Sequence, residues 1–246
     1  MKSVIKPELL GAYVNADDIE AEINQSDWLD LGQFGIESTN QELRDFYRQS
    51  TLLEKMEADW EIDAIGLAKN KISFHDVLVN SYWASATADF IRYQLLKQHR
   101  SFTFETVMSS PDKIDFLAKA RELGYKTYLY FVATEDPAIN IRRVQQRVRN
   151  GGHDVPHDKI TSRYYRSLNL LLPAIRLTNR AYLFDNSGEN QIWVAEITNG
   201  TELSIQSASK PSWFQQSVID KLLQENSSKT QSYGKRDVLW SHSPIV

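Results

Sequence analysis

The segment KTYLYFVATEDP, residues Lys126 to Pro137, decides the expected fold class. Its first eight residues form a nearly continuous apolar run, which is typical of a strand buried on both faces of a parallel sheet. Asp136 and Pro137 then give the usual start of a helix, an acidic cap followed by a proline in the first turn. A buried strand that leads directly into a helix predicts one unit of a parallel α/β fold.

Similar units lie on both sides of this segment. A short apolar strand at 12–14 leads into an amphipathic helix through Ile23, and SFTFETV contains a strand that ends at Glu105. Ser110, Pro111 and Asp112 then open a helix that closes at Gly124, and a further strand ends at Asp185. The alternation predicts an α/β fold, a parallel sheet flanked by helices with right-handed connections.

The domain organisation is inferred from changes in hydrophobic pattern and expected secondary structure along the sequence. Residues 1–23 and 78–199 form the expected α/β core, in which 80–99 is a strong helix. Residues 24–77 are expected to be an inserted α+β segment, with a helix over 40–58 and a hairpin around 69–71. Residues 200–225 are expected to form a closing strand and a helix, and 226–246 a flexible tail. The aromatic residues of the insertion fit either a partner surface or the insertion's own core: Trp28, Tyr47 and Trp60.

Two helices rich in arginine meet at a glycine hinge. Arg143 and Arg147 lie four residues apart on the first helix, which Gly151 and Gly152 end. Pro156 suits the first turn of the second helix. Such helices can close over an anion, although two solvated helix faces explain the same charges.

Acidic and hydroxyl residues follow the expected strands, at 15–17, 105–106, 134–136 and 185–187. In parallel α/β sheets, ligands bind at the carboxyl ends of the strands. A row of acids beneath a basic lid suits phosphoryl transfer, in which catalysis consists mainly of positioning and charge stabilisation.

Composition narrows the class of protein. Of the 246 residues 41% are hydrophobic, so a large buried core is expected, and the net charge of −4 argues against a nucleic-acid-coating protein. There is no cysteine, hence no disulfide framework or thiol nucleophile. No signal peptide or membrane-spanning run is recognised, so we expect a cytoplasmic protein without nucleic-acid or membrane partners.

Four segments together resemble the zeta toxin family of P-loop small-molecule kinases: YVNADDIEAEI, FTFETVMS, GYKTYLYFVATEDPAINIRRVQQRVRNGGHDVPHDKITSRYYRSL and YLFDNSGE. The resemblance implies a P-loop NTPase core that uses ATP and Mg²⁺. The characterised toxins phosphorylate the 3′-hydroxyl of UDP-N-acetylglucosamine or related sugars. The resemblance also implies a toxin–antitoxin context, with an antitoxin-like protein as a partner.

On the substrate side, the resemblance assigns Asp17 as the aspartate that takes the proton from the acceptor hydroxyl. A helix N-cap is the structural alternative for Asp17, and Asp18 is the neighbouring candidate. Glu105 matches a strand-end glutamate that contacts substrate or helps to order the metal site. Val107 stands where the family often has a hydroxyl residue, and Thr106 is a substitute for it only if the backbone turns differently.

On the nucleotide side, Arg147 matches a lid arginine that contacts phosphates, with Arg143 and Arg163 as further clamps. His153 stands at the hinge where some relatives carry an arginine, and no protein metal site is expected there. Asn186 belongs to a turn that resembles the segment beside the adenine ring, although a plain Asn-Ser-Gly turn explains it nearly as well.

The sequence departs from the family in one respect: it contains no Gly-x-x-x-x-Gly-Lys-Ser/Thr motif. Either a displaced start has removed the first strand and its phosphate loop, or the chain is a degenerate family member. The first alternative makes the complete product a kinase, and the second makes the chain an inert protein that acts through its surface. In both cases residues 1–246 are expected to bind ATP weakly or not at all, and to expose a sheet edge that promotes association.

Overall fold

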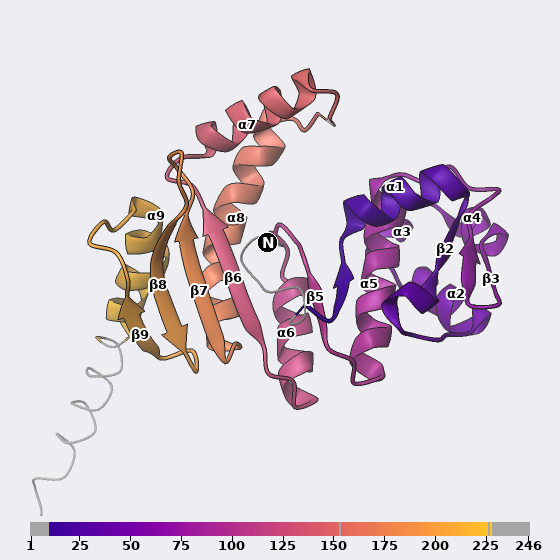
Figure 1. The fold of residues 1–246 in the computed structure, drawn as a ribbon, viewed down its shortest axis with the longest axis horizontal. Coiled ribbons are helices and arrows are strands. Elements are labelled where there is room, and N and C mark those ends of the chain that lie inside the picture. Colours follow the sequence, from indigo (N-terminus) through magenta and orange to yellow (C-terminus); the bar gives the residue numbers. More distant parts are fainter. Residues whose placement is uncertain (1–9, 153, 226, 228–246) are drawn as a thin grey trace, which may run out of the picture. The chain divides into compact units, whose positions relative to one another are not determined.

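The computed structural model describes residues 10–152, 154–225 and 227. The chain forms two compact units, Met1–Thr106 and Val107–Val246, which Figure 1 colours from indigo to magenta and from magenta to yellow. Each unit contains one pair of parallel strands flanked by helices, so the predicted α/β class is confirmed. The tail predicted over 226–246 lies, except for Ser227, outside the described residues.

In the first unit, β1 (Ala12–Val14) runs parallel to β5 (Phe102–Phe104), with Val14 opposite Phe104. The helix α1 (Ala16–Ser26) follows β1 directly, and α5 (Ser81–Lys97) precedes β5. Both strands therefore end at the same edge of a two-stranded sheet, beside the start of α1.

The segment 24–77 contains a separate three-stranded antiparallel sheet and short helices. Its strands are β2 (Trp28–Asp30), β3 (Gly66–Ala68) and β4 (Lys71–Ser73), in the order β2-β4-β3. Its helical elements are η2 (Leu31–Phe34), α2 (Asn40–Arg48), α3 (Thr51–Glu54) and α4 (Asp59–Ala64). The predicted hairpin is present, because Lys69 and Asn70 adopt φ values of 51° and 62°, as a tight hairpin turn requires.

The single helix predicted over 40–58 is wrong, because the chain turns between α2 and α3. Tyr47 and Leu53 are both buried in the same core, at 0% and 1% exposure. On one straight helix these residues would point about 120° apart, so the break lets both side chains reach the core.

One hydrophobic core joins the segment 24–77 to α1 and α5. The Tyr47 ring lies 5.4 Å from the Trp83 ring, and its hydroxyl lies 2.7 Å from Thr87 Oγ1. Tyr47 is therefore a core residue, whereas Trp28 and Trp60 remain 39% and 66% exposed.

The second unit contains a four-stranded sheet in the order β6-β7-β8-β9. Its strands are β6 (Tyr128–Ala133), β7 (Arg180–Asp185), β8 (Ile192–Thr198) and β9 (Glu202–Ile205). β6 and β7 are parallel, and β9, the predicted closing strand, pairs with β8 in the antiparallel direction. The helices are α6 (Asp112–Glu122), α7 (Pro137–Arg149), α8 (His157–Arg176) and α9 (Ser212–Phe214), which continues into the π-helix η3 (Gln215–Ile219).

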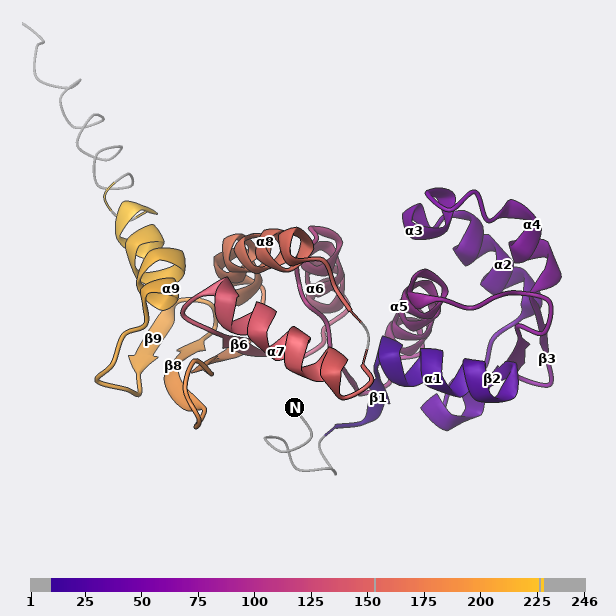
Figure 2. The ribbon, with the colours of Figure 1, turned by 90° about the horizontal axis from the view of Figure 1, so that it is seen from above.

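Local signals fix the boundaries of the two arginine helices. The Asp136 side chain accepts a hydrogen bond of 2.6 Å from the N–H of Ala138, and Pro137 is the first residue of α7. Gly151 ends α7 with a φ of 87°, in the left-handed region that glycine adopts without strain. Leu171 and Ile175 of α8 belong to the same buried core as Leu183 of β7. Figure 2 shows α8 lying along the sheet, seen from above.

Candidate active site

The acidic residues predicted for the substrate side lie at one edge of the first unit's parallel sheet. The N–H of Glu105 donates to the carbonyl of Val14 over 3.3 Å, which aligns the ends of β5 and β1. Asn15 Nδ2 lies 3.5 Å from Glu105 Oε2. Asp17 stands in the first turn of α1, two residues after Asn15, so Asp17 and Glu105 share this edge.

Asn15 caps α1, and this frees Asp17 from that role. The Asn15 Oδ1 atom accepts hydrogen bonds from the N–H groups of Asp17 (2.8 Å) and Asp18 (3.2 Å). The helix N-cap considered for Asp17 is therefore wrong, because the side chain of Asn15 fills it. The carboxylates of Asp17 and Asp18 are both exposed at a helix N-terminus, where negative charge is stabilised.

Tyr13 belongs to the same cluster and was not predicted. The Asn15 side chain lies 3.5 Å from its hydroxyl. Burial raises the pKa of Tyr13, and the neighbouring Glu105 raises it further. Tyr13 therefore keeps its proton at neutral pH and presents a neutral hydroxyl to the side chains of Asn15 and Glu105. Thr106 is exposed directly after Glu105.

In the second unit, a buried carboxylate organises the turn after β7. Asp185 is 6% exposed and accepts three hydrogen bonds, from Trp213 Nε1 (2.8 Å), Ser187 N (3.0 Å) and Ser187 Oγ (2.9 Å). Trp213 belongs to α9, which with η3 forms the C-terminal helix of the described residues. The helix thus holds the turn that contains Asn186.

The end of β6 is held in a similar way. The N–H of Glu135 donates to Ser187 Oγ over 2.7 Å, and the Glu135 carboxylate accepts from the N–H of Ser212 over 3.0 Å and from its hydroxyl. The hydroxyl of Tyr164 on α8 donates to the carbonyl of Thr134 over 2.8 Å. Burial, followed by the charge of Glu135, raises the pKa of Tyr164 to about 12, so this donor stays protonated. The two strand ends, α8 and the C-terminal helix form one hydrogen-bonded cluster.

Of the predicted nucleotide-side residues, the structure brings Arg143 and Asn186 together. The guanidinium of Arg143 donates to the carbonyl of Asn186 over 2.7 Å. Arg147 is exposed farther along α7. The chain at Gly152 passes close to its side chain, since a Cβ atom added at Gly152 would lie only 2.7 Å from Arg147 Cγ. Arg163 is half-buried on α8, which packs against α7. His153 lies outside the described residues.

The predicted residues therefore fall into two groups. Asp17, Glu105 and Thr106 belong to the first unit, whereas the arginines and Asn186 belong to the second. A single cleft lined by both groups stays a prediction.

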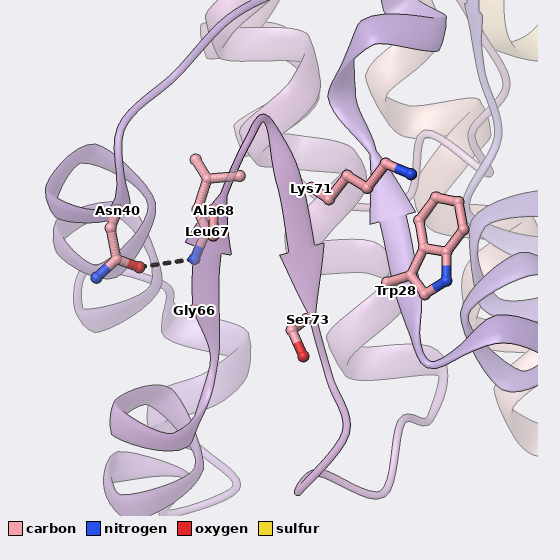
Figure 3. Close-up of a pocket in the computed structure, with 7 residues that line it drawn as sticks. All are labelled: Trp28, Asn40, Gly66, Leu67, Ala68, Lys71 and Ser73. Carbon is pink, nitrogen blue, oxygen red and sulfur yellow. Dashed lines mark hydrogen bonds between the residues drawn. The ribbon is translucent and has the colours of Figure 1, made fainter.

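The first unit has a shallow groove that none of the predicted site residues lines. Its lining comes from the three-stranded sheet and the start of α2: Trp28, Asn40, Gly66, Leu67, Ala68, Lys71 and Ser73 (Figure 3). Lys71 Nζ lies 3.8 Å from the centre of the Trp28 ring, in a cation–π contact.

Comparisons with known proteins support the resemblance. The zeta toxin family model matches residues 79–198, which confirms the resemblance over this part of the chain. A curated protein of Haemophilus influenzae, described as uncharacterised, is 32% identical over 69 residues. The match covers 28% of this chain and 49% of that protein, so the chain spans about half the length of that relative. No solved structure matches the chain significantly.

Two further observations concern membrane spans and the phosphate loop. Within 10–152, 154–225 and 227, no helix is long and apolar enough to cross a membrane. The sequence contains no glycine-rich loop with the Lys-Ser/Thr pair that holds phosphates and Mg²⁺.

Proposed function

We propose that this chain carries the acceptor side and the lid of a zeta toxin-type phosphotransferase. The acceptor is a hydroxyl of a nucleotide sugar such as UDP-N-acetylglucosamine, or of another small molecule, and the setting is the cytoplasm. The observation that carries the proposal is the common edge of β1 and β5, where Asp17 and Glu105 lie on either side of Asn15. The family match over 79–198 supports a P-loop kinase-like function in general.

Asp17 is proposed as the general base. Its carboxylate is exposed at the start of α1, while its backbone N–H is held by Asn15. A carboxylate at this position can orient an alcohol and take its proton. Glu105 and the neutral hydroxyl of Tyr13, which both lie within 3.5 Å of Asn15 Nδ2, are proposed to position the same acceptor, with Thr106 as an additional substrate contact.

On the nucleotide side, ATP with Mg²⁺ supplies the phosphoryl group in the proposed function. Arg143, Arg147 and Arg163, together with His153 and Asn186, are the residues proposed to contact the nucleotide. Guanidinium groups offer permanent charge and paired donors to phosphate oxygens. The phosphate cradle has to come from a glycine-rich loop that this sequence does not contain, so residues 1–246 are proposed to be inactive by themselves.

The test uses a form in which a strand, a Gly-x-x-x-x-Gly-Lys-Ser loop and a helix precede residue 1. In that form, Asp17→Asn is expected to lower phosphorylation of UDP-activated sugars by about a hundredfold or more, because proton removal fails. Nucleotide binding should change little, since the carboxylate acts on the acceptor. Asp18→Asn is the matched control, because Asp18 is also exposed and also donates its N–H to Asn15. Full turnover of the Asp17→Asn variant would refute the assignment.

The alternative function is a catalytically inert family member that acts by binding a partner such as an antitoxin-like protein. The absence of the phosphate loop and the exposed Trp60, at 66%, favour this alternative. The DNA upstream of the Met1 codon distinguishes the two. An in-frame strand followed by a glycine-rich loop would support the kinase, and stop codons would support the binding protein.

A further inference from the structure

Asn15 contacts its surroundings with both ends of its side-chain amide. The Oδ1 atom accepts two capping hydrogen bonds, from the N–H groups of Asp17 (2.8 Å) and Asp18 (3.2 Å). These bonds fix the orientation of the amide, because only its oxygen can accept from a backbone N–H. The NH₂ end therefore points the other way, and it lies 3.5 Å from both the Tyr13 hydroxyl and Glu105 Oε2.

The capping role alone does not require an amide at this position. Serine and aspartate cap helices about as well as asparagine, since each offers an oxygen to the first turn. Asn80 caps α5 with the same pair of bonds, because its Oδ1 accepts from the N–H groups of Tyr82 (2.9 Å) and Trp83 (3.3 Å). What distinguishes Asn15 is its donor end, which is directed at a hydroxyl of its own strand and at the carboxylate that follows the neighbouring strand.

The charges around this donor favour a neutral amide. Burial raises the pKa of Tyr13, the hydrogen bond from Asn15 lowers it, and the charges of Glu105 and Asp18 raise it again. With an aspartate at position 15, an oxygen would replace the NH₂ group 3.5 Å from Glu105 Oε2. Two carboxylates at that distance repel each other, so one of them would take up a proton or turn away. The amide instead offers a donor to the carboxylate of Glu105.

We propose that Asn15 is a positioning residue for the acceptor: it holds the Glu105 carboxylate and the Tyr13 hydroxyl in a fixed relation to the base Asp17. This inference rests on the proposed phosphotransferase function. One amide ties the start of α1, which carries the base, to the two groups proposed to bind the acceptor. Contacts as long as 3.5 Å often tighten only when substrate binds.

The first test uses residues 1–246 and needs no activity. Asn15→Ser keeps a capping oxygen but removes the NH₂ donor, so the midpoint of thermal unfolding should stay within about 1 °C of the wild type. The pKa of Tyr13 should rise, because the hydrogen bond that lowers it is lost. Carbon-13 NMR of ring-labelled tyrosine follows this titration, and Tyr13→Phe identifies the signal. Asn80→Ser is the matched control, since it alters a cap and leaves the Tyr13 contact in place. An unchanged titration of Tyr13 in Asn15→Ser would overturn the proposal.

The second test uses the form with a phosphate loop. Asn15→Ser should lower kcat for the UDP-activated sugar by about tenfold or more, because the acceptor is misplaced, and the KM for ATP should not change. Asn15→Asp also keeps the cap but adds repulsion from Glu105, so its kcat should be lower still. Asn80→Ser and Asn80→Asp should keep the wild-type kcat.

The outcomes separate this inference from the proposed function. Wild-type turnover in both Asn15 variants, together with lost turnover in Asp17→Asn, would refute the role of Asn15 and leave the proposed function standing. Full turnover in Asp17→Asn would refute the proposed function itself, whatever the Asn15 variants do.

Discussion

The replacement of Trp213 by phenylalanine tests the cluster that holds the carboxyl ends of β6 and β7. The indole N–H donates to the Asp185 carboxylate over 2.8 Å, and the two residues are only 2% and 6% exposed. Phenylalanine keeps an aromatic ring but removes the donor. The Asp185 carboxylate would then retain only its two hydrogen bonds from Ser187.

The expected cost follows from the hydrogen bond and from the smaller ring. A buried hydrogen bond to a charged group contributes about 1.5–3 kcal/mol. The smaller ring leaves a partly filled space beside Phe131 and Phe214, whose rings lie 6.1 and 6.0 Å from that of Trp213, and this adds about 1 kcal/mol. Trp213→Phe should therefore lower the free energy of unfolding by about 2.5–4 kcal/mol.

Urea denaturation followed by far-ultraviolet circular dichroism measures this loss. Trp60→Phe is the matched control, since Trp60 is 66% exposed in the first unit, and it should change the free energy of unfolding by less than about 0.5 kcal/mol. The loss in Trp213→Phe should appear in the transition of the second unit. Equal stability of the two variants would refute the reasoning that this hydrogen bond fixes the strand ends.

Three further predictions follow from individual contacts. Asn15→Ala should cost about 1 kcal/mol in thermal unfolding, because the cap of α1 is lost, and a change below a few tenths would show that the cap contributes nothing. Lys97, at 2.5 Å, and then Ser38 lower the pKa of Glu42 from 4.5 to about 2. This pair should stabilise the fold above pH 4.5 and lose its effect as the pH falls toward 2. Because Lys97 is 64% exposed, the contribution is below about 1 kcal/mol, and Glu42→Gln should flatten this part of the stability–pH curve; an unchanged curve would contradict it. In the form with a phosphate loop, Arg147→Ala should weaken nucleotide binding and turnover together, by about tenfold or more, and unchanged ATP affinity would remove Arg147 from the nucleotide site.

Local sequence signals predicted the elements that position the site. The apolar run before Ala133 forms β6, Asp136 and Pro137 start α7, and Gly151 ends it. These signals act within a few residues, so they can be read without knowing the fold. The hairpin at Lys69 and Asn70 was predictable for the same reason.

Contacts between distant residues could not be predicted in this way. The bonds from Trp213 to Asp185 and from Arg143 to Asn186 join residues 28 and 43 positions apart, and no periodic pattern indicates them. The cap of α1 was assigned to Asp17 as an alternative, although Asn15 follows β1 directly and is an equally good capping residue. Its position immediately after the strand was the available signal. The break between α2 and α3 depends on how Tyr47 and Leu53 share a core with α5, which is a tertiary effect.

Calorimetric titration of residues 1–246 with ATP and Mg²⁺, together with a phosphorylation assay on UDP-activated sugars, tests the central claim most directly. The claim is that this chain holds the acceptor side and the lid of a phosphotransferase but no phosphate cradle. Arginines on α7 and α8 supply charge, whereas phosphates also need the backbone N–H groups and the lysine of a glycine-rich loop. The account predicts weak or undetectable ATP binding and no phosphorylated product. Tight ATP binding with turnover would contradict it, because the chain would then contain a complete phosphate site.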